Sequence, residues 1–392
     1  MGEAREEQLD ISVILYVPLP GQEAEEATAT EHTNVANQQI LQQKNIIEWL
    51  RIATFTFFLL AGQTVATFLG RLYFDKGGNN KWMETFVQTA AFPLIFLLYF
   101  ISPLKNPTTN DINANSPSKL VLVSIYTMLG IFLAANSMLY SVGLLYLPVS
   151  TYTLICASQL GFNALFSFFI NSQKFTPFIV NSVVLLTISS ILLVFQSDST
   201  ESKPVSKGKF VIGFICTLGA SAGYGLMLSL IQFCFNKVLK QENFKVVLDM
   251  IVYPSLVATL AILVGLFASG EWKGLRRDME EYELGNVSYL MTLIWTAISW
   301  QVFNIGCTGL IFEVSSLFSN VISTFGLPIV PVLAVFIFHD KMDGLKVIAM
   351  VLAIWGFVSY VYQHYLDDHK SKTEINNVNE EAPDCEGELI HE

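Results

Sequence analysis

The amino-acid sequence predicts an all-α polytopic membrane protein of about ten transmembrane helices, arranged as two inverted five-helix repeats. Three observations predict this fold class. First, 52% of the 392 residues are hydrophobic and only 14% are charged, which is too little charge to cover a soluble domain of this length. Second, apolar runs of membrane-spanning length follow one another along the chain. Third, the two halves of the chain correspond to each other.

The acidic excess of the chain lies in its two ends. Residues 1–46 contain eight acidic and two basic side chains, and residues 367–392 contain nine acidic and two basic ones. The formal net charge of −11 therefore leaves the body between them at +2. Both ends are polar and poor in aromatic residues, so we expect disordered acidic tails at 1–46 and 367–392. A basic patch interleaved with aromatic residues does not occur, and nucleic acid is not an expected partner.

The first repeat is predicted at 47–196. A membrane-spanning helix needs about 20 mostly apolar residues. Runs of about this length occur at 50–70, 83–102, 119–140, 149–170 and 177–195. Polar stretches at 75–81 and 103–118 separate the first three of these runs.

A polar linker at 197–209 leads to the second repeat, predicted at 210–366. Its apolar runs lie at 210–233, 246–268, 289–310, 314–337 and 345–365. The charged stretch 269–286 separates two of them. Because the joins near Leu147 and near Glu313 are very short, a total of nine or eleven spans stays open.

The internal correspondence is clearest between the fourth and ninth runs. The pattern that begins at Val149 and ends at Gly161 overlays the pattern that begins at Val314 and ends at Gly326, at a constant offset. An odd number of spans in each half places the second half upside down in the membrane. Inverted repeats of this kind hold their substrate near the middle of the membrane, between the two halves.

Uncharged polar side chains inside the apolar runs are the candidates for a binding site, because hydrocarbon offers them no water. An amide is both donor and acceptor, as is the edge of a nitrogenous ring, and an aromatic face can stack on such a ring. Amides also hold membrane helices together, and that interpretation stays open for each of them. The predicted substrate-binding residues are Gln63, Asn136, Tyr140, Gln159, Trp300 and Gln301.

Acidic residues within or beside the spans are the candidates for proton coupling. Glu313 is preferred because apolar residues precede it, and burial disfavours the charged form of a carboxyl group. Asp249 and Glu84, near the starts of their spans, are the alternatives. Each of them could equally be a helix-end residue in contact with water.

Long segments of the chain resemble the plant purine permeases. They are the stretches 62–93, 139–178, 295–323 and 338–357, and the likeness extends over about 47–366. The resemblance implies the drug/metabolite transporter fold. It also implies proton-coupled uptake of adenine, cytokinins and related purine nucleobases by alternating access, with membrane lipid around the protein. A plasma-membrane location with both termini cytoplasmic is expected on the same ground. Some relatives carry alkaloids or vitamin B6, so an alkaloid permease of the same fold is the alternative.

Other functional classes find less support in the sequence. No HExxH motif, no dinucleotide-binding loop and no nucleophile with a base at motif spacing occurs, so an enzyme is not expected. The five cysteines show no metal-ligand spacing, and neither a metal nor a cofactor is expected. A receptor-like protein that does not transport remains a further alternative, which an uptake assay separates from a transporter.

Overall fold

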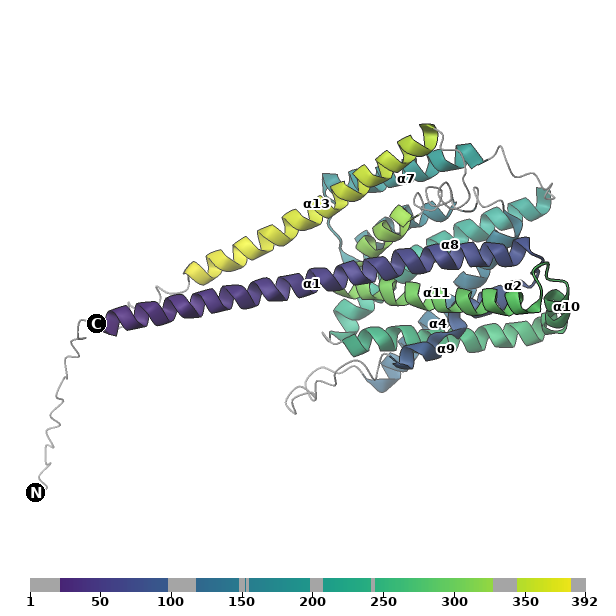
Figure 1. Cartoon of the computed structure of the whole chain (residues 1–392), viewed down its shortest axis with the longest axis horizontal. Coiled ribbons are helices and arrows are strands. Elements are labelled where there is room, and N and C mark those ends of the chain that lie inside the picture. The colour runs from purple at the N-terminus through teal and green to yellow at the C-terminus, as the bar shows by residue number, and fades with distance from the viewer. Residues whose placement is uncertain are drawn as a thin grey trace, which may run out of the picture. The chain divides into compact units, whose positions relative to one another are not determined.

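A computed structural model describes residues 22–97, 118–147, 152, 155–197, 207–240, 244–326 and 344–381. Every regular element in these residues is a helix (Figure 1). The chain divides into a unit of residues Met1–Arg51 and a body of residues Ile52–Glu392, and everything below concerns the body unless stated. The linkers at 103–117 and 198–206 and the end of the predicted ninth span lie outside the described residues.

The first half of the chain contains helices whose ends follow from single residues. They are α1 (Gln22–Asp75), α2 (Lys81–Ala90), the short η1 (Phe92–Ile95), α4 (Lys119–Tyr146), α6 (Gln159–Asn171) and α7 (Pro177–Ser197). α2 gives way to η1 next to Pro93, since proline has no N–H to continue an α-helical ladder. α6 stops at Ser172, which has a left-handed φ of 53°.

The second half of the chain begins with α8 (Lys207–Phe233), which continues as a π-helical turn, η2 (Cys234–Leu239). The left-handed Lys240 then ends it. The remaining elements are α9 (Phe244–Ser269), the short η3 (Glu271–Gly274) and α10 (Leu275–Glu280), α11 (Asn286–Glu313), a helix that covers 316–326, and α13 (Gly344–Glu381).

The chain is a polytopic membrane protein. Within the described residues, five helical stretches are long and apolar enough to cross a bilayer: Ile46–Asp75, Lys119–Tyr146, Gly208–Leu239, Phe244–Ser269 and Asn286–Glu313. Three shorter apolar helices lie at Ile155–Asn171, Pro177–Ser189 and Met350–Gln363. All of them coincide with predicted spans.

The two predicted tails differ from the structure in part. α1 is helical from Gln22 and α13 continues to Glu381, so residues 22–46 and 367–381 are helical rather than disordered. Residues 22–46 are rich in alanine, glutamate and glutamine, and residues 367–381 contain glutamate and lysine, all of which are good helix formers. Composition therefore predicted their polarity but not their secondary structure.

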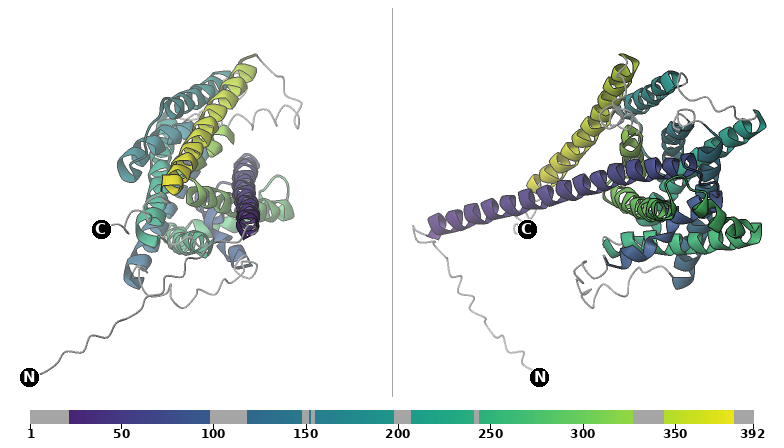
Figure 2. Two further views of the ribbon diagram at one scale, coloured as in Figure 1. Left: turned by 90° about the vertical axis from the view of Figure 1, so that its left-hand side faces the viewer. Right: turned by 45° about the vertical axis from the view of Figure 1, so that its right-hand side comes forward.

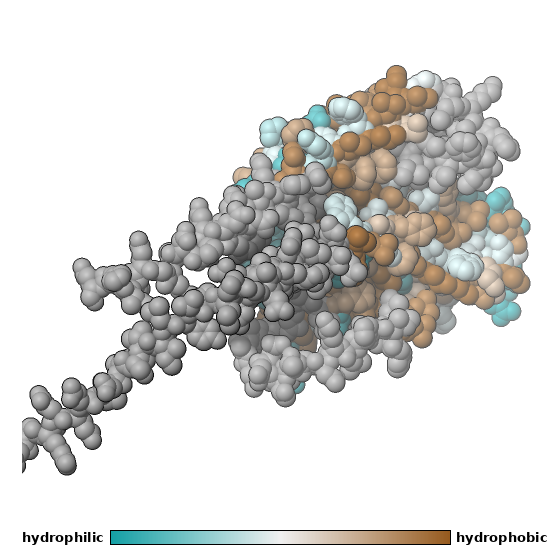
Figure 3. Space-filling model, turned by 60° about the vertical axis from the view of Figure 1, so that its left-hand side comes forward, coloured by the Kyte–Doolittle hydropathy of each residue, from teal (hydrophilic) through white to brown (hydrophobic). Residues whose placement is uncertain are grey.

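The outer surface of the body is apolar over much of its extent, as the brown residues of Figure 3 show. Leu120, Phe169, Val264 and Trp355 are each more than 60% exposed. A soluble monomer rarely leaves so much contiguous apolar surface in water. Such a surface is suited to contact with the hydrocarbon chains of membrane lipids.

Close helix packing surrounds the centre of the body. α4 packs against both α8 and α9, α6 packs against α8, and α2 contacts α4, α9 and α11. α13 lies along α7, as the views in Figure 2 also show. α1 approaches α11 so closely that a Cβ built on Gly62 would lie 2.5 Å from the backbone nitrogen of Phe303. Glycine at this position is what allows the two backbones to meet.

Candidate functional site

A cavity of about 120 Å³ lies within the body. Its walls come from α1, α2, α4, α6, α8, α11 and the helix at 316–326, so both halves of the chain contribute to it. About half of the lining residues are apolar or aromatic, and the other half carry amides, hydroxyls and one carboxyl group. Its polar members are Gln63, Thr67, Glu84, Gln88, Thr89, Asn136, Ser137, Gln159, Asn304 and Ser323.

Among the described residues that line the cavity, Glu84 is the one carboxylic acid, and it is only 2% exposed. Its Oε2 accepts hydrogen bonds from Nε2 of Gln88, at 2.6 Å, and from the hydroxyl of Ser141 on α4. Among the described residues, no basic side chain forms an ion pair with it. A buried carboxylate without a cation is unfavourable unless it takes up a proton or binds a positively charged ligand.

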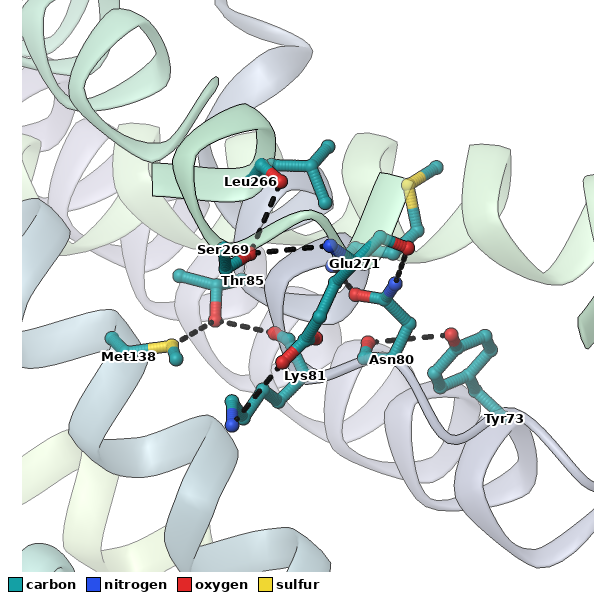
Figure 4. Close-up of polar contacts among 9 residues, drawn as sticks. Tyr73, Asn80, Lys81, Thr85, Met138, Leu266, Ser269 and Glu271 are labelled. Carbon is teal, nitrogen blue, oxygen red and sulfur yellow. Dashed lines mark hydrogen bonds and ion pairs between the residues drawn. The ribbon is translucent and has the colours of Figure 1, made fainter. Parts of the chain in front are cut away.

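A cluster of polar contacts surrounds the start of α2, the helix that carries Glu84 (Figure 4). Asn80 caps the helix, because its Oδ1 accepts from the backbone N–H of Met83 at 2.9 Å. Its Nδ2 donates to the carbonyl of Glu271 at 3.1 Å, and Lys81 pairs with the carboxylate of Glu271 at 3.3 Å. The first turn of α2 is thus attached to the start of η3, one turn before Glu84.

We expect Asn80→Ala to lower the stability of the protein by about 1 kcal/mol or more. Loss of a helix N-cap costs about that much, and this substitution also removes the bond to Glu271. Thermal unfolding of the detergent-purified protein measures the change. Asn79→Ala is the matched control, because the amide of Asn79 bonds only to the carbonyl of Gly77 within the same loop. An equal loss in both variants would contradict the capping role.

A second group of cavity residues forms a chain of hydrogen bonds. Tyr140 donates its hydroxyl to Oε1 of Gln159 at 3.3 Å, and Nε2 of Gln159 donates to the hydroxyl of Ser323 at 3.4 Å. Ser323 in turn donates to Oε1 of Gln63 at 2.9 Å. These contacts join α4, α6, the helix at 316–326 and α1, and they orient two amides at the cavity wall.

Aromatic rings form much of the remaining wall: Tyr140, Tyr152, Tyr224, Trp300 and Phe303. Trp300 packs edge-on against Phe303, with ring centroids 5.4 Å apart. Its indole N–H has no hydrogen-bond partner among the described residues. An unpartnered donor is costly in an apolar interior, and a ligand acceptor would satisfy it.

A buried polar cluster lies beside the cavity, toward Asn171 and Phe233, the last residues of α6 and α8. Oδ1 of Asn163 accepts from Ser229 at 2.9 Å, and its Nδ2 donates to the carbonyl of Ser316 at 3.0 Å. Oε1 of Gln232 accepts from the hydroxyl of Ser316 at 2.6 Å. These side chains hold three helices together and are already satisfied by one another, which favours a packing role for them over ligand binding.

Five of the six predicted substrate-binding residues line the cavity: Gln63, Asn136, Tyr140, Gln159 and Trp300. Gln301 does not, and its placement is a correction. Nε2 of Gln301 donates to the carbonyl of Thr89 at 3.2 Å, which ties α11 to α2. The side chain of Gln301 is therefore turned toward α2, while its neighbour Trp300 lines the cavity.

Of the three predicted proton-coupling residues, only Glu84 lines the cavity. Asp249 lies in the second turn of α9, and Glu313 is the last residue of α11. Glu313 was preferred because apolar residues precede it in the sequence. In the structure, however, α11 ends at Glu313. The placement of the three acids therefore makes Glu84 the candidate that adjoins the cavity.

The cavity also contains residues that the sequence did not single out. Gln88 lies one turn after Glu84, and Asn304 lies one turn after Trp300. Each lies one helical turn from another lining residue, so helical periodicity identifies them. Tyr152, Cys156 and Tyr224 carry no comparable local signal. Among the described residues, no group of acids, histidines and cysteines could hold a metal ion.

Comparisons with known proteins identify the family. A family profile described as purine nucleobase transmembrane transport matches residues 50–370. "Probable purine permease 10" of Arabidopsis thaliana is 56% identical over 366 residues, which cover 93% of this chain and 94% of that protein. "Purine permease 21" of the same plant is 56% identical over 356 residues, covering 90% and 91% of the two chains.

A solved crystal structure of a protein shares the fold, with a TM-score of 0.51 over 79% of this chain and 97% of that one, at 12% identity. Identity at that level speaks for the fold alone. The sequence relatives speak for more, since they match along nearly their whole length. The chain is a transporter and not an enzyme, and it belongs to the purine permease family of purine nucleobase transmembrane transporters.

Proposed function

We propose that this protein is a proton-coupled importer of purine-like heterocycles, such as adenine and cytokinins, that works by alternating access. The observation that carries the proposal is the composition of the cavity, which combines aromatic faces, amides and a single buried carboxyl group. Aromatic faces stack on flat rings, and amides hydrogen-bond to ring edges. The carboxyl group supplies a place for the coupled proton.

The proposed architecture is ten spans in two inverted five-helix repeats, with the cavity between the halves. Lining residues from both halves, among them Gln63, Gln159, Trp300 and Ser323, support this arrangement. The carrier would expose the cavity to one side of the membrane and then to the other. We place both termini in the cytoplasm and the protein in the plasma membrane, as the family resemblance suggests.

A substrate panel tests the proposal. Adenine, a cytokinin, caffeine, an alkaloid and pyridoxine are supplied under one pH gradient to yeast that lacks its own purine carrier. We expect saturable adenine uptake that a protonophore abolishes. Uptake of adenine that the protonophore does not affect would contradict proton coupling, and no uptake of any purine would contradict the proposed substrate class.

Glu84 also favours a second candidate, import of a cationic alkaloid, because a carboxylate in an apolar cavity pairs well with a protonated amine. Competition separates the two candidates. We expect excess adenine to slow the uptake of a labelled alkaloid through the shared cavity. If alkaloids compete with one another while adenine has no effect, the alkaloid permease is the correct assignment.

We expect Trp300→Ala to weaken the apparent affinity for adenine by about tenfold or more, since stacking of a base on an aromatic side chain contributes about 1–3 kcal/mol. The concentration dependence of initial uptake measures the change. Trp295→Ala is the matched control, because Trp295 lies on the same helix but is 55% exposed on its outer surface. Equal effects of the two substitutions would remove the stacking role of Trp300.

A further inference from the structure

We infer that the cavity selects heterocycles with an unsubstituted basic ring nitrogen, and that the coupled proton lies between this nitrogen and Oε1 of Glu84. The inference rests on the proposed function and names the chemistry by which that site would read its substrate. It follows from how the two oxygens of one carboxyl group are used.

The two oxygens of Glu84 have different surroundings. Oε2 accepts from both Gln88 and Ser141, and a carboxyl oxygen has two lone pairs for such bonds. Its capacity is therefore filled. Oε1 accepts no hydrogen bond from the described residues, and it is not one of their fully enclosed polar atoms without a partner. On α1 its neighbour is Gly70, where even a Cβ would stop 3.3 Å away. Since Glu84 lines the cavity, Oε1 is the oxygen that a ligand can reach.

This asymmetry favours Oε1 as the place where a proton binds. A proton on Oε2 requires Ser141 to turn its hydroxyl hydrogen to the carbonyl of Ser137, whereas a proton on Oε1 changes no hydrogen bond among the described residues. The protonated side chain then presents an O–H donor to the cavity. A ring nitrogen with a free lone pair accepts a hydrogen bond from this O–H. If the proton moves to the nitrogen, the new N–H donates a hydrogen bond to the ionised Oε1. The hydrogen bond between Oε1 and the ring nitrogen thus forms in both protonation states: a protonated glutamate with a neutral base, and a carboxylate with a protonated base.

Other groups near Glu84 do not replace it in this role. Tyr140, Tyr152 and Cys156 also line the cavity. In their neutral forms they carry no negative charge that could balance the positive charge of a protonated base. The charged residues at the nearby helix ends have partners of opposite charge: Arg71 with Asp75 at 3.0 Å, and Lys81 with Glu271 at 3.3 Å. On α4 the polar residues near Glu84 are Ser137 and Ser141, which are uncharged. Thr259 of α9 and Gln301 of α11 each form a hydrogen bond with Thr89 of α2, and they are uncharged as well.

Deaza analogues of adenine test the inference, because each replaces one ring nitrogen with C–H and keeps the shape of the molecule. The purified protein is loaded with labelled adenine, and 1-deaza-, 3-deaza- and 7-deazaadenine compete for the site. We expect one analogue to compete at least tenfold less well than the others, since a site that hydrogen-bonds a substrate atom rejects the analogue that lacks it.

Two substitutions assign that discrimination to Glu84. Glu84→Gln still offers an N–H donor to the ring nitrogen, so the same analogue stays disfavoured, now at every pH. Glu84→Met has a similar volume but no polar atom, so the analogues compete equally. Glu283→Gln, a change in an exposed loop acid that pairs with Lys76, is expected to behave like the unmodified protein.

The outcomes separate this inference from the proposed function. An identical ranking of analogues in the unmodified protein and in Glu84→Met would overturn the inference, and so would failure of every ring to bind. Binding with the predicted ranking but without uptake driven by a pH gradient would uphold the inference and contradict proton-coupled import. Proton-driven uptake together with a ranking that does not depend on Glu84 would support proton-coupled import and overturn the inference.

Discussion

Glu84→Gln is expected to abolish the accumulation of adenine against its gradient while exchange of adenine across the membrane continues. Glutamine keeps the shape of the side chain and an oxygen for Gln88 and Ser141, but it cannot take up or release a proton. One proton that crosses 100 mV contributes about 2.3 kcal/mol, which corresponds to roughly 40-fold accumulation at about 1.4 kcal/mol per decade. In proteoliposomes with an imposed proton gradient, we expect this ratio to fall to about one.

The same change at other acids serves as the control for Glu84→Gln. Glu313→Gln lies at the end of α11 and Glu283→Gln lies in an exposed loop, and both are expected to accumulate adenine normally. Counterflow of labelled adenine shows whether each variant still binds and carries the base. Normal accumulation by Glu84→Gln, or a selective loss in Glu313→Gln, would transfer the proton-carrying role away from the cavity.

Gly62→Ala is expected to have a large effect on folding. A Cβ at Gly62 would lie 2.5 Å from the backbone nitrogen of Phe303 and 2.8 Å from the carbonyl oxygen of Ser299. Because both are backbone atoms, α1 and α11 would have to separate. Overpacking of this kind typically costs about 1–3 kcal/mol. The separation would also move Gln63 away from Phe303, two residues of the cavity wall, so transport falls together with stability.

Gly161→Ala provides the matched comparison for Gly62→Ala. A Cβ at Gly161 on α6 has no atom within 4 Å, and alanine favours helix over glycine by about 1 kcal/mol. We expect this variant to be as stable as the unmodified protein or more so. Size-exclusion profiles and thermal unfolding in detergent measure both variants. A normal profile and full transport for Gly62→Ala would show that α1 and α11 do not pack as described.

Sequence reasoning located the helices well where apolar length decides the outcome. The runs at 119–140, 246–268 and 289–310 became α4, α9 and α11, because about 20 apolar residues have few other stable arrangements in a membrane protein. The acidic ends of the chain were a different case. Low hydrophobicity indicated disorder, but the helix-forming residues in 22–46 and 367–381 continue α1 and α13. Composition reports exposure more reliably than it reports backbone conformation.

The site was predictable where two candidate residues share a helical face. Asn136 and Tyr140 are one turn apart on α4, and both reach the cavity. Gln301 lies outside the lining because its amide donates to the carbonyl of Thr89 on α2, a contact between helices that the sequence of α11 alone does not show. The importance of Glu84 was not readable from its own neighbours in sequence. It depends on Ser141, which comes from another helix and is far away along the chain.

The most direct test of the account measures the protons that are taken up when adenine binds. Calorimetric titration of the purified protein, repeated in buffers of different ionisation enthalpy, gives that number at each pH. We predict uptake of up to about one proton per bound base, rising with pH as the empty site loses its proton, and no uptake in Glu84→Gln. Proton uptake of zero at every pH, or the same value in Glu84→Gln, would contradict the account that base and proton bind together at this carboxyl group.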